Sequence, residues 1–221
     1  CGTAVSSSEV SRASALLDEE LEKWRNRPLG EVPYLVLDAR YENVRRDGAV
    51  VSCAVLIAAG VDGEGRRSIL GVSVSMSEAE LHWRDLLQSL KERGMYGLKM
   101  ITSDEHQGIK AALRATFPGV PWQRCQVHLQ KNAAAYVPKS HMKAGVARTI
   151  REIFNAPDRE EAERLLDKAV RRYEKCASKL AAWMAEHLPE GFTVFSLPPA
   201  LRRRLRSTNM LEWVNKEIRR R

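Results

Sequence analysis

Three acidic side chains stand where this sequence could support metal-dependent chemistry. Asp38 follows the apolar run 34–37, Asp104 follows the run 98–103, and Glu212 lies far downstream. Neighbouring strands are about 4.8 Å apart, so two strand-end carboxylates can reach cations separated by roughly 3.5–4 Å, and a third carboxylate from a helix can complete the shell. Hard oxygen ligands favour Mg²⁺ or Mn²⁺. The three residues therefore predict a two-metal phosphoryl-transfer site.

Each carboxylate also has a purely structural interpretation. An Asp that follows a strand is commonly a turn residue or a helix N-cap. Glu212 can be the N3 partner of a capping box that begins at Asn209. Taken one at a time, the residues favour these structural roles, and only their joint context favours a metal site.

Four sequence blocks supply that context. They are YLVLDARYENVR at 34–45, SDEHQGI at 103–109, WQRCQVH at 122–128 and STNMLEWVNKEIRRR at 207–221. In this order the blocks resemble the signature blocks of the Mutator-like transposases of bacterial insertion sequences. The resemblance runs from about residue 1 to the last residue, and four blocks in the right order are far more specific than any one of them.

The resemblance implies an α/β fold with a ribonuclease-H-like mixed sheet, in the order βββαβαβ, and an all-α insertion before the catalytic glutamate helix. It assigns the catalytic and metal-binding roles of a DDE transposase to Asp38, Asp104 and Glu212, with Mg²⁺ (or Mn²⁺) as the cofactor. Such an enzyme nicks the element end, and the freed 3′-hydroxyl then attacks target DNA. The implied partners are double-stranded DNA, at element ends and target, and a second copy of the chain in a homodimer.

The patterning predicts the elements that must position these residues. Apolar, β-branched runs predict strands at 34–37, 49–61 and 68–74. A capping box from Ser77 to Glu80 predicts a helix up to Arg93, followed by a strand at 98–103, a helix at 107–116 and a short strand around 120–127. A helical crossover makes the Asp104 strand parallel to one of the others, and in the implied fold that neighbour carries Asp38.

We expect four segments: the end of an N-terminal DNA-binding region with a connecting helix at 1–30, the core at 31–132, the helical insertion at 133–205, and the catalytic helix at 206–221. The connecting helix, at 13–25, could equally be a surface helix packed on the core. The insertion reads as helices at 141–155, 158–175 and 176–188, with a second capping box from Asp158 to Glu161. Because the chain does not begin with Met and stops on Arg221, we expect it to be a fragment cut at both ends.

Charge is distributed unevenly along the chain. The whole chain carries a formal net charge of +8, whereas residues 1–100 carry −2 and residues 101–221 carry +10. A basic second half predicts an anionic partner. Guanidinium groups bind phosphate bidentately, so the expected DNA contacts are the arginines that flank Glu212: Arg202, Arg203, Arg204, Arg206, Arg219 and Arg220. The alternative for these arginines, and for the basic residues of the 158–175 helix, is an ordinary solvated face.

Supporting roles are open for a few further residues. Cys125 and His128 form one close pair, but a structural zinc site normally needs four ligands, so we favour a structural role beside the active site. His106 either hydrogen-bonds a scissile phosphate or a metal-bound water, or serves as a helix-start residue with a local partner. The four cysteines contain no CxxC pair, and no apolar run spans 18 residues, so we expect a cytoplasmic protein in a reducing compartment.

Two other functions remain open from the sequence. One is a metal-dependent nuclease of the same fold that cuts DNA without strand transfer. The other is a catalytically inactive DNA-binding relic. A strand-joining assay separates the first from a transposase, and a nicking assay separates the second.

Overall fold

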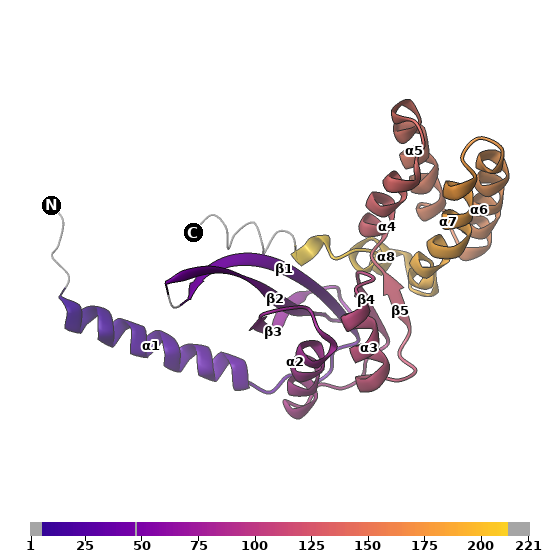
Figure 1. The fold of residues 1–221 in the computed structure, drawn as a ribbon. Helices are drawn as coiled ribbons and strands as arrows, with labels where there is room; N and C mark the ends of the chain where they lie inside the picture. The colour runs from indigo at the N-terminus through magenta and orange to yellow at the C-terminus, as the bar shows by residue number, and fades with distance from the viewer. Residues whose placement is uncertain (1–5, 47, 212–221) are drawn as a thin grey trace, which may run out of the picture.

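A five-stranded mixed sheet forms the centre of the molecule in a computed structural model that describes residues 6–46 and 48–211 (Figure 1). The strand order is β3-β2-β1-β4-β5. The strands are β1 (Tyr34–Arg46), β2 (Ala49–Val61), β3 (Arg67–Ser75), β4 (Met100–Ser103) and β5 (Trp122–Arg124). Together with α2 (Glu80–Glu92) and α3 (Gln107–Thr116) they follow the predicted order βββαβαβ.

Strand β1 is the central strand and carries Asp38. It pairs in parallel with β4, with Val36 opposite Thr102, and antiparallel with β2 along its whole length. The prediction that the Asp38 and Asp104 strands are parallel neighbours is therefore confirmed. The prediction that Asp38 ends its strand is wrong: β1 continues to Arg46, because its antiparallel ladder with β2 extends as a two-stranded ribbon beyond the last β4 pairing.

Alternating side chains give the sheet two different covered faces. Leu35 and Leu37 pack with α2 and α3, around the fully buried Trp83. Val36 and Met100 point to the opposite face and pack against Leu205, the last residue of α8 (Pro199–Leu205). Asp38 lies two residues after Val36, so its side chain belongs to the α8 face.

The helices between β5 and α8 form a lobe with its own core beside β5 (Figure 1). Its elements are α4 (Gln126–Ala133), η1 (Ala134–Tyr136), η2 (Ser140–Met142), α5 (Lys143–Phe154), α6 (Arg159–Glu174), α7 (Ser178–His187), η3 (Leu188–Gly191) and η4 (Thr193–Ser196). The lobe core runs from Leu129 to Phe195, whereas Leu197 and Leu205 pack on the sheet. Residues 126–127, expected in a strand, instead begin α4.

The first helix, α1 (Ser7–Asn26), begins earlier than expected and extends away from the sheet (Figure 1). Ser6 starts it with a complete capping box: its Oγ accepts from the Glu9 N–H at 3.3 Å, and its N–H donates to Glu9 Oε2 at 2.8 Å. No residue of α1 is buried. The chain after α1 is held to the sheet by Arg93, which donates to the Leu70 carbonyl at 2.7 Å and to the Arg27 carbonyl at 3.0 Å.

Only one of the two capping boxes predicted inside the chain forms its key bond. The Asp158 side chain accepts from the Glu161 N–H at 2.8 Å and caps α6. The box from Ser77 to Glu80 is wrong, since α2 has Ala79 at its N-cap and no side-chain cap bond. The chain instead turns Glu78 inward, where 9% of it is exposed.

A glycine at the start of α3 permits a close approach between two segments. A Cβ at Gly108 would overlap the Glu78 carbonyl oxygen. We therefore expect Gly108→Ala to lower the free energy of unfolding by about 1–3 kcal/mol, as overpacking does, measured by chemical denaturation. The matched control is Gly145→Ala in α5, where a Cβ meets nothing within 4 Å and helix propensity should add about 0.5–1 kcal/mol. Equal stability of Gly108→Ala and the parent would contradict this packing.

Candidate active site

Two carboxylates, those of Asp38 and Asp104, lie at matching positions of neighbouring segments at one edge of the sheet. Since Val36 pairs with Thr102, Asp38 and Asp104 each lie two residues beyond this pair. Asp38 is 7% exposed, and Asp104 is half-buried just after the end of β4. Parallel pairing therefore brings together two residues that are far apart in sequence.

The residues after Asp104 build a tight turn around it. The His106 N–H donates to Asp104 Oδ1 at 3.3 Å. The His106 imidazole accepts from the Gly108 N–H at 3.3 Å through Nδ1 and so caps α3. His106 thus has the local partner that one of its two interpretations expected, and it holds the Asp104 carboxylate through its backbone.

Glu78 is a third carboxylate at this edge that the sequence did not single out. Its Oε2 lies 3.8 Å from His106 Nδ1. Burial raises the pKa of Glu78, His106 acts in the opposite direction, and the charge of Asp104 raises the pKa further. In the sequence, Glu78 looked like a spacer inside a capping box, so only the fold reveals its position.

Cys125 and His128 lie beside the two aspartates. Burial acts to raise the pKa of the Cys125 thiol, but the hydrogen bond and charge of His128, with backbone N–H groups, hold it below its ordinary value. The bond to Cys125 raises the pKa of His128; burial opposes this, and the charges of Cys125, Asp38 and Asp104 add to it. The charges of Asp38 and Asp104 are thus close enough to act on the pKa of His128.

Cys125 should sustain the raised pKa of His128. We expect Cys125→Ala to lower the pKa of His128, measured by NMR titration of its ring protons, whereas Cys53→Ala, which removes a buried thiol on β2, should not. A raised folded-state pKa stabilises the fold below the ordinary His value and loses that contribution as pH rises through the folded pKa. In Cys125→Ala, the contribution of His128 to the free energy of unfolding should therefore disappear at a lower pH than in the parent. An unchanged His128 titration in Cys125→Ala would refute the pairing.

Among residues 6–46 and 48–211, one group of three His, Cys, Asp or Glu side chains could hold a metal, and it contains neither Cys125 nor His128. Glu105, His187 and Glu190 can bring ligand atoms within 4.8 Å of one another. Both carboxylates already have cationic partners: Arg124 pairs with Glu105 and Glu190, and Lys110 lies 3.3 Å from Glu190. A metal there would have to displace these side chains.

Hydrogen bonds dock the chain after α8 over the same sheet edge. The Thr102 hydroxyl donates to the Leu205 carbonyl at 2.7 Å, and the Gln126 N–H donates to the Arg206 carbonyl at 2.9 Å. The Thr208 N–H donates to Cys125 Sγ at 3.4 Å. Leu211 is fully buried in the cluster on the Asp38 face.

Part of the predicted site falls beyond this docked segment. Glu212, Arg219 and Arg220 lie outside the described residues. Asn209 is already helical and exposed, with Thr208 preceding it, so the interpretation of Asn209 as an N-cap is wrong.

The arginines of α8 differ in how firmly they are held. Arg202 donates to the carbonyls of Leu197 at 2.8 Å and Phe195 at 3.2 Å. The other arginines with partners are Arg204, bonded to the Glu64 and Gly65 carbonyls, and Arg206, bonded to Asn155 Oδ1 at 2.8 Å. Within the described part of the chain, exposed Arg203 has no side-chain partner. With Arg67 it lines a hollow of about 450 Å³ that also contains Ser207 and Asn209.

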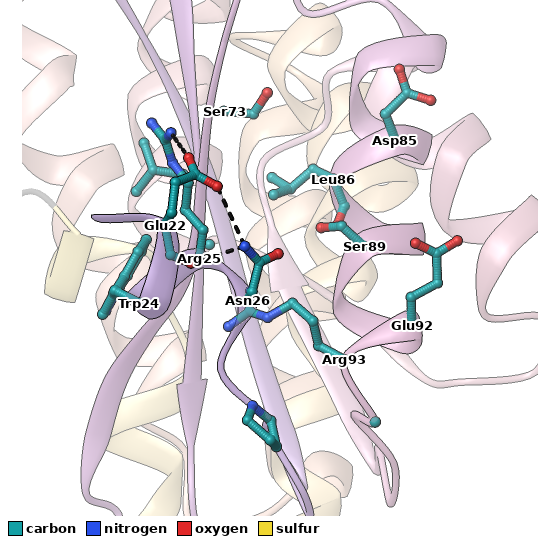
Figure 2. Close-up of a pocket in the computed structure, with 14 residues that line it drawn as sticks. Glu22, Trp24, Arg25, Asn26, Ser73, Asp85, Leu86, Ser89, Glu92 and Arg93 are labelled. Carbon is teal, nitrogen blue, oxygen red and sulfur yellow. Dashed lines mark hydrogen bonds and ion pairs between the residues drawn. The ribbon is translucent and has the colours of Figure 1, made fainter. Parts of the chain in front are cut away.

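A larger groove, of about 830 Å³, lies elsewhere, between α1, β3 and α2. Figure 2 shows Asp85 and Glu92 on the α2 side and Glu22 on the α1 side, with Glu22 bonded to Arg25 and Asn26. Neither Asp38 nor Asp104 lines this groove. Its lining has three carboxylates and two arginines, whereas the hollow around Arg203 has arginines and no carboxylate, so the groove is the less favourable of the two for a phosphate backbone.

Comparisons with known proteins agree with one another. A family model described as the transposase, Mutator family, matches residues 1–221. The transposase of insertion sequence element IS406 from Burkholderia multivorans is 55% identical, over 99% of this chain and 56% of its own length. The transposase of ISRM5 from Rhizobium meliloti is 40% identical, over 100% of this chain and 56% of its own. The transposase of IS256 in transposon Tn4001 from Staphylococcus aureus is 34% identical, over 100% and 57%.

The chain thus spans little more than half the length of these relatives. Among solved structures, a chain of a simian T-cell lymphotropic virus intasome in complex with PP2A regulatory subunit B56 gamma matches 72% of this chain and 49% of its own, at 12% identity. Its TM-score of 0.26 is too low to define a shared fold. Within the described residues, every helix is too short or too polar to cross a membrane.

Proposed function

Because this chain belongs to the Mutator family of transposases, we propose that it is the catalytic part of a DNA transposase that cuts DNA and transfers the cut strand. We assign the DDE roles to Asp38, Asp104 and Glu212. The observation that carries the proposal is the parallel pairing of β1 and β4, because Asp38 and Asp104 each lie two residues beyond its last pair, Val36 and Thr102. A shared sheet edge is where a phosphoryl-transfer site needs two carboxylates.

The donor set at this edge fits a divalent cation. Asp38 and Asp104 offer hard carboxylate oxygens of the kind that Mg²⁺ and Mn²⁺ prefer. Within the described ranges, Asp104 forms no ion pair with Lys or Arg, and its charge helps to raise the pKa of Glu78. This excess of negative charge favours cation binding. When bound, two such ions supply the positive charge that activates an attacking oxygen and stabilises a leaving oxygen.

The chain's own groups hold this centre in place. Burial between β2 and β4 restricts Asp38, and the His106 N–H orients Asp104. Cys125, Asp38 and Asp104 all act to raise the pKa of His128, which favours a positive charge beside both aspartates. We therefore assign Cys125 and His128 a positioning role in place of zinc binding.

Glu212 is proposed as the third carboxylate, although it lies outside the described residues. Support comes from the preceding residue, because Leu211 is buried against the Asp38 face of the sheet. Thr102, Gln126 and Cys125 anchor the segment just before it. Leu211, the last described residue, thus lies on the side of the sheet where a third ligand would be needed.

We further propose a ribonuclease-H-like core with a helical insertion. Two observations support it: the element order βββαβαβ, and a strand order with β1 between β2 and β4. The segment boundaries at 30, 132 and 205 remain predictions, as does a homodimer. The lobe's separate hydrophobic core agrees with an insertion that folds as its own unit.

We propose that the partner is DNA and that it binds near α8. Arg203 and Arg67 face solvent around one hollow with Ser207 and Asn209, and such a group of donors can contact phosphate. Arg202, Arg204 and Arg206 would contribute positive charge while fastening the local structure. The roles of Arg219 and Arg220 remain predictions.

The test is a strand-joining reaction in a protein of the relatives' full length that carries this chain. With Mg²⁺ and a labelled element end, we expect nicking followed by joining of the 3′-end to a target plasmid. Nicking without joining would favour the alternative of a nuclease. DNA binding without nicking would favour the catalytically inactive relic.

A further inference from the structure

Arg124 is a buried cation next to the proposed metal site. It is the last residue of β5 and pairs in register with Ser103, the residue before Asp104. Only 1% of it is exposed. A buried guanidinium is costly unless carboxylates and hydrogen bonds compensate it, so its partners reveal its role.

The guanidinium joins two carboxylates from different parts of the molecule. Nη2 pairs with Glu105, the residue that follows Asp104. Nη1 pairs with Glu190 Oε2 at 2.8 Å, in η3 where the helical lobe returns to the sheet. The contacts link the segment that carries Asp104 to the lobe.

Other polar contacts dock the same returning segment onto β5 and α4. The Val194 N–H donates to Gln123 Oε1 at 2.7 Å, and Gln126 Nε2 donates to the Gly191 carbonyl at 2.9 Å. Gln123 and Gln126 are both buried. Satisfied buried polar groups favour one arrangement over its alternatives, so the returning segment is a fixed support for Glu190.

We propose that Arg124 is a positioning residue for the Asp104 carboxylate: it holds the adjacent Glu105 at one end of its guanidinium and is itself anchored to the lobe through Glu190 at the other. This inference rests on the proposed metal-binding role of Asp104. Arg124 is buried and acts through Glu105, so it has no direct contact with DNA in this arrangement.

The chemistry of the side chain explains why an arginine serves here. A guanidinium is a planar fork that can bind two carboxylates at once, whereas a lysine ammonium is a single point charge. The same cation also fills the space between Glu105 and Glu190, two of the three groups that could otherwise gather around a metal. Arg124→Lys would keep the charge but should lose the two-ended connection.

The experiment measures position and metal binding separately. Hydrogen exchange should become about tenfold faster at the amides of residues 104–106 in Arg124→Lys and in the milder Glu190→Gln. Manganese affinity, measured by calorimetry without DNA, should fall by about the same factor. The matched control is the exposed pair Arg159 and Glu163 on α6, 2.6 Å apart: Arg159→Lys and Glu163→Gln should change neither quantity.

Two further variants separate positioning from loss of stability and from failure of the proposed function. Leu166→Ala, in the lobe core, should lower global stability without changing exchange at 104–106 or manganese affinity. The proposal is overturned if hydrogen exchange at residues 104–106 is unchanged in both Arg124→Lys and Glu190→Gln. It is also overturned if Asp104→Asn abolishes manganese binding while Arg124→Lys leaves the affinity intact. If the parent binds no manganese, the proposed function has failed, and the exchange result alone decides the positioning role.

Discussion

Asp38→Asn and Asp104→Asn should each reduce Mg²⁺-dependent DNA nicking to below about one per cent of the parent rate, and Glu212→Gln should do the same. Each substitution removes one anionic ligand while keeping nearly the same side-chain volume. The cation shell is then incomplete, whereas the packing of the sheet is preserved. The measurement is single-turnover nicking of a labelled element end, with thermal unfolding recorded for every variant.

Asp85→Asn supplies the matched control. Asp85 is an exposed carboxylate on α2 that lines the large groove away from the sheet edge. Its variant should nick DNA at the parent rate. Substantial nicking by either aspartate variant would remove that residue from the site, and loss of activity in Asp85→Asn would move attention to the groove in Figure 2.

Arg67→Gln combined with Arg203→Gln should weaken duplex binding in a salt-dependent manner. Each phosphate contact contributes about 0.9 to the slope of log affinity against log salt, so the slope of the double variant should be shallower by about 1.8. Fluorescence anisotropy between low and physiological salt would measure it. Unfolding temperature should stay close to the parent value, because both side chains are exposed.

Two comparisons make this result interpretable. Lys23→Gln with Arg25→Gln removes the same charge from α1, where both residues pair with neighbouring glutamates, and should leave the slope unchanged. Arg202→Gln should mainly lower stability, because the Arg202 guanidinium donates hydrogen bonds to backbone carbonyls. If the Arg67/Arg203 and Lys23/Arg25 double variants have the same salt slope, DNA binds another face.

The sequence predicted the elements whose patterns are local. The helix at 107–116 and the strand at 49–61 were found with their observed bounds, because amphipathic spacing and a long β-branched run are strong signals. Strand β1 was underestimated after residue 37, since residues 38–46 are mostly polar or charged and only β2 pairs with them there. Helix α4 was missed because QVHLQKNA has a weak apolar stripe.

The candidate site also contains residues that the sequence identified and others that only the fold reveals. Apolar runs and the resemblance together singled out Asp38 and Asp104, and the parallel pairing of their segments then gave both the same offset from the Val36–Thr102 pair. Glu78 and Arg124 could not be found in this manner, because polar residues become buried through contacts between distant segments. The α8 arginines looked equivalent in sequence, and only their carbonyl partners distinguish Arg202 from Arg203.

The order in which the strands pair has a consequence for the timing of folding. The β1-β2-β3 meander joins neighbours in sequence and can form early, whereas β4 must return to β1 after a helical crossover. Such non-local pairings form slowly, because the entropy cost of closing the loop comes before the new contacts stabilise the chain. The two aspartates therefore meet only in a late step of folding, after β4 has been synthesised. A nascent chain that has made Asp38 but not yet β4 lacks one carboxylate of the proposed centre, so we expect no DNA nicking before β4 has paired with β1.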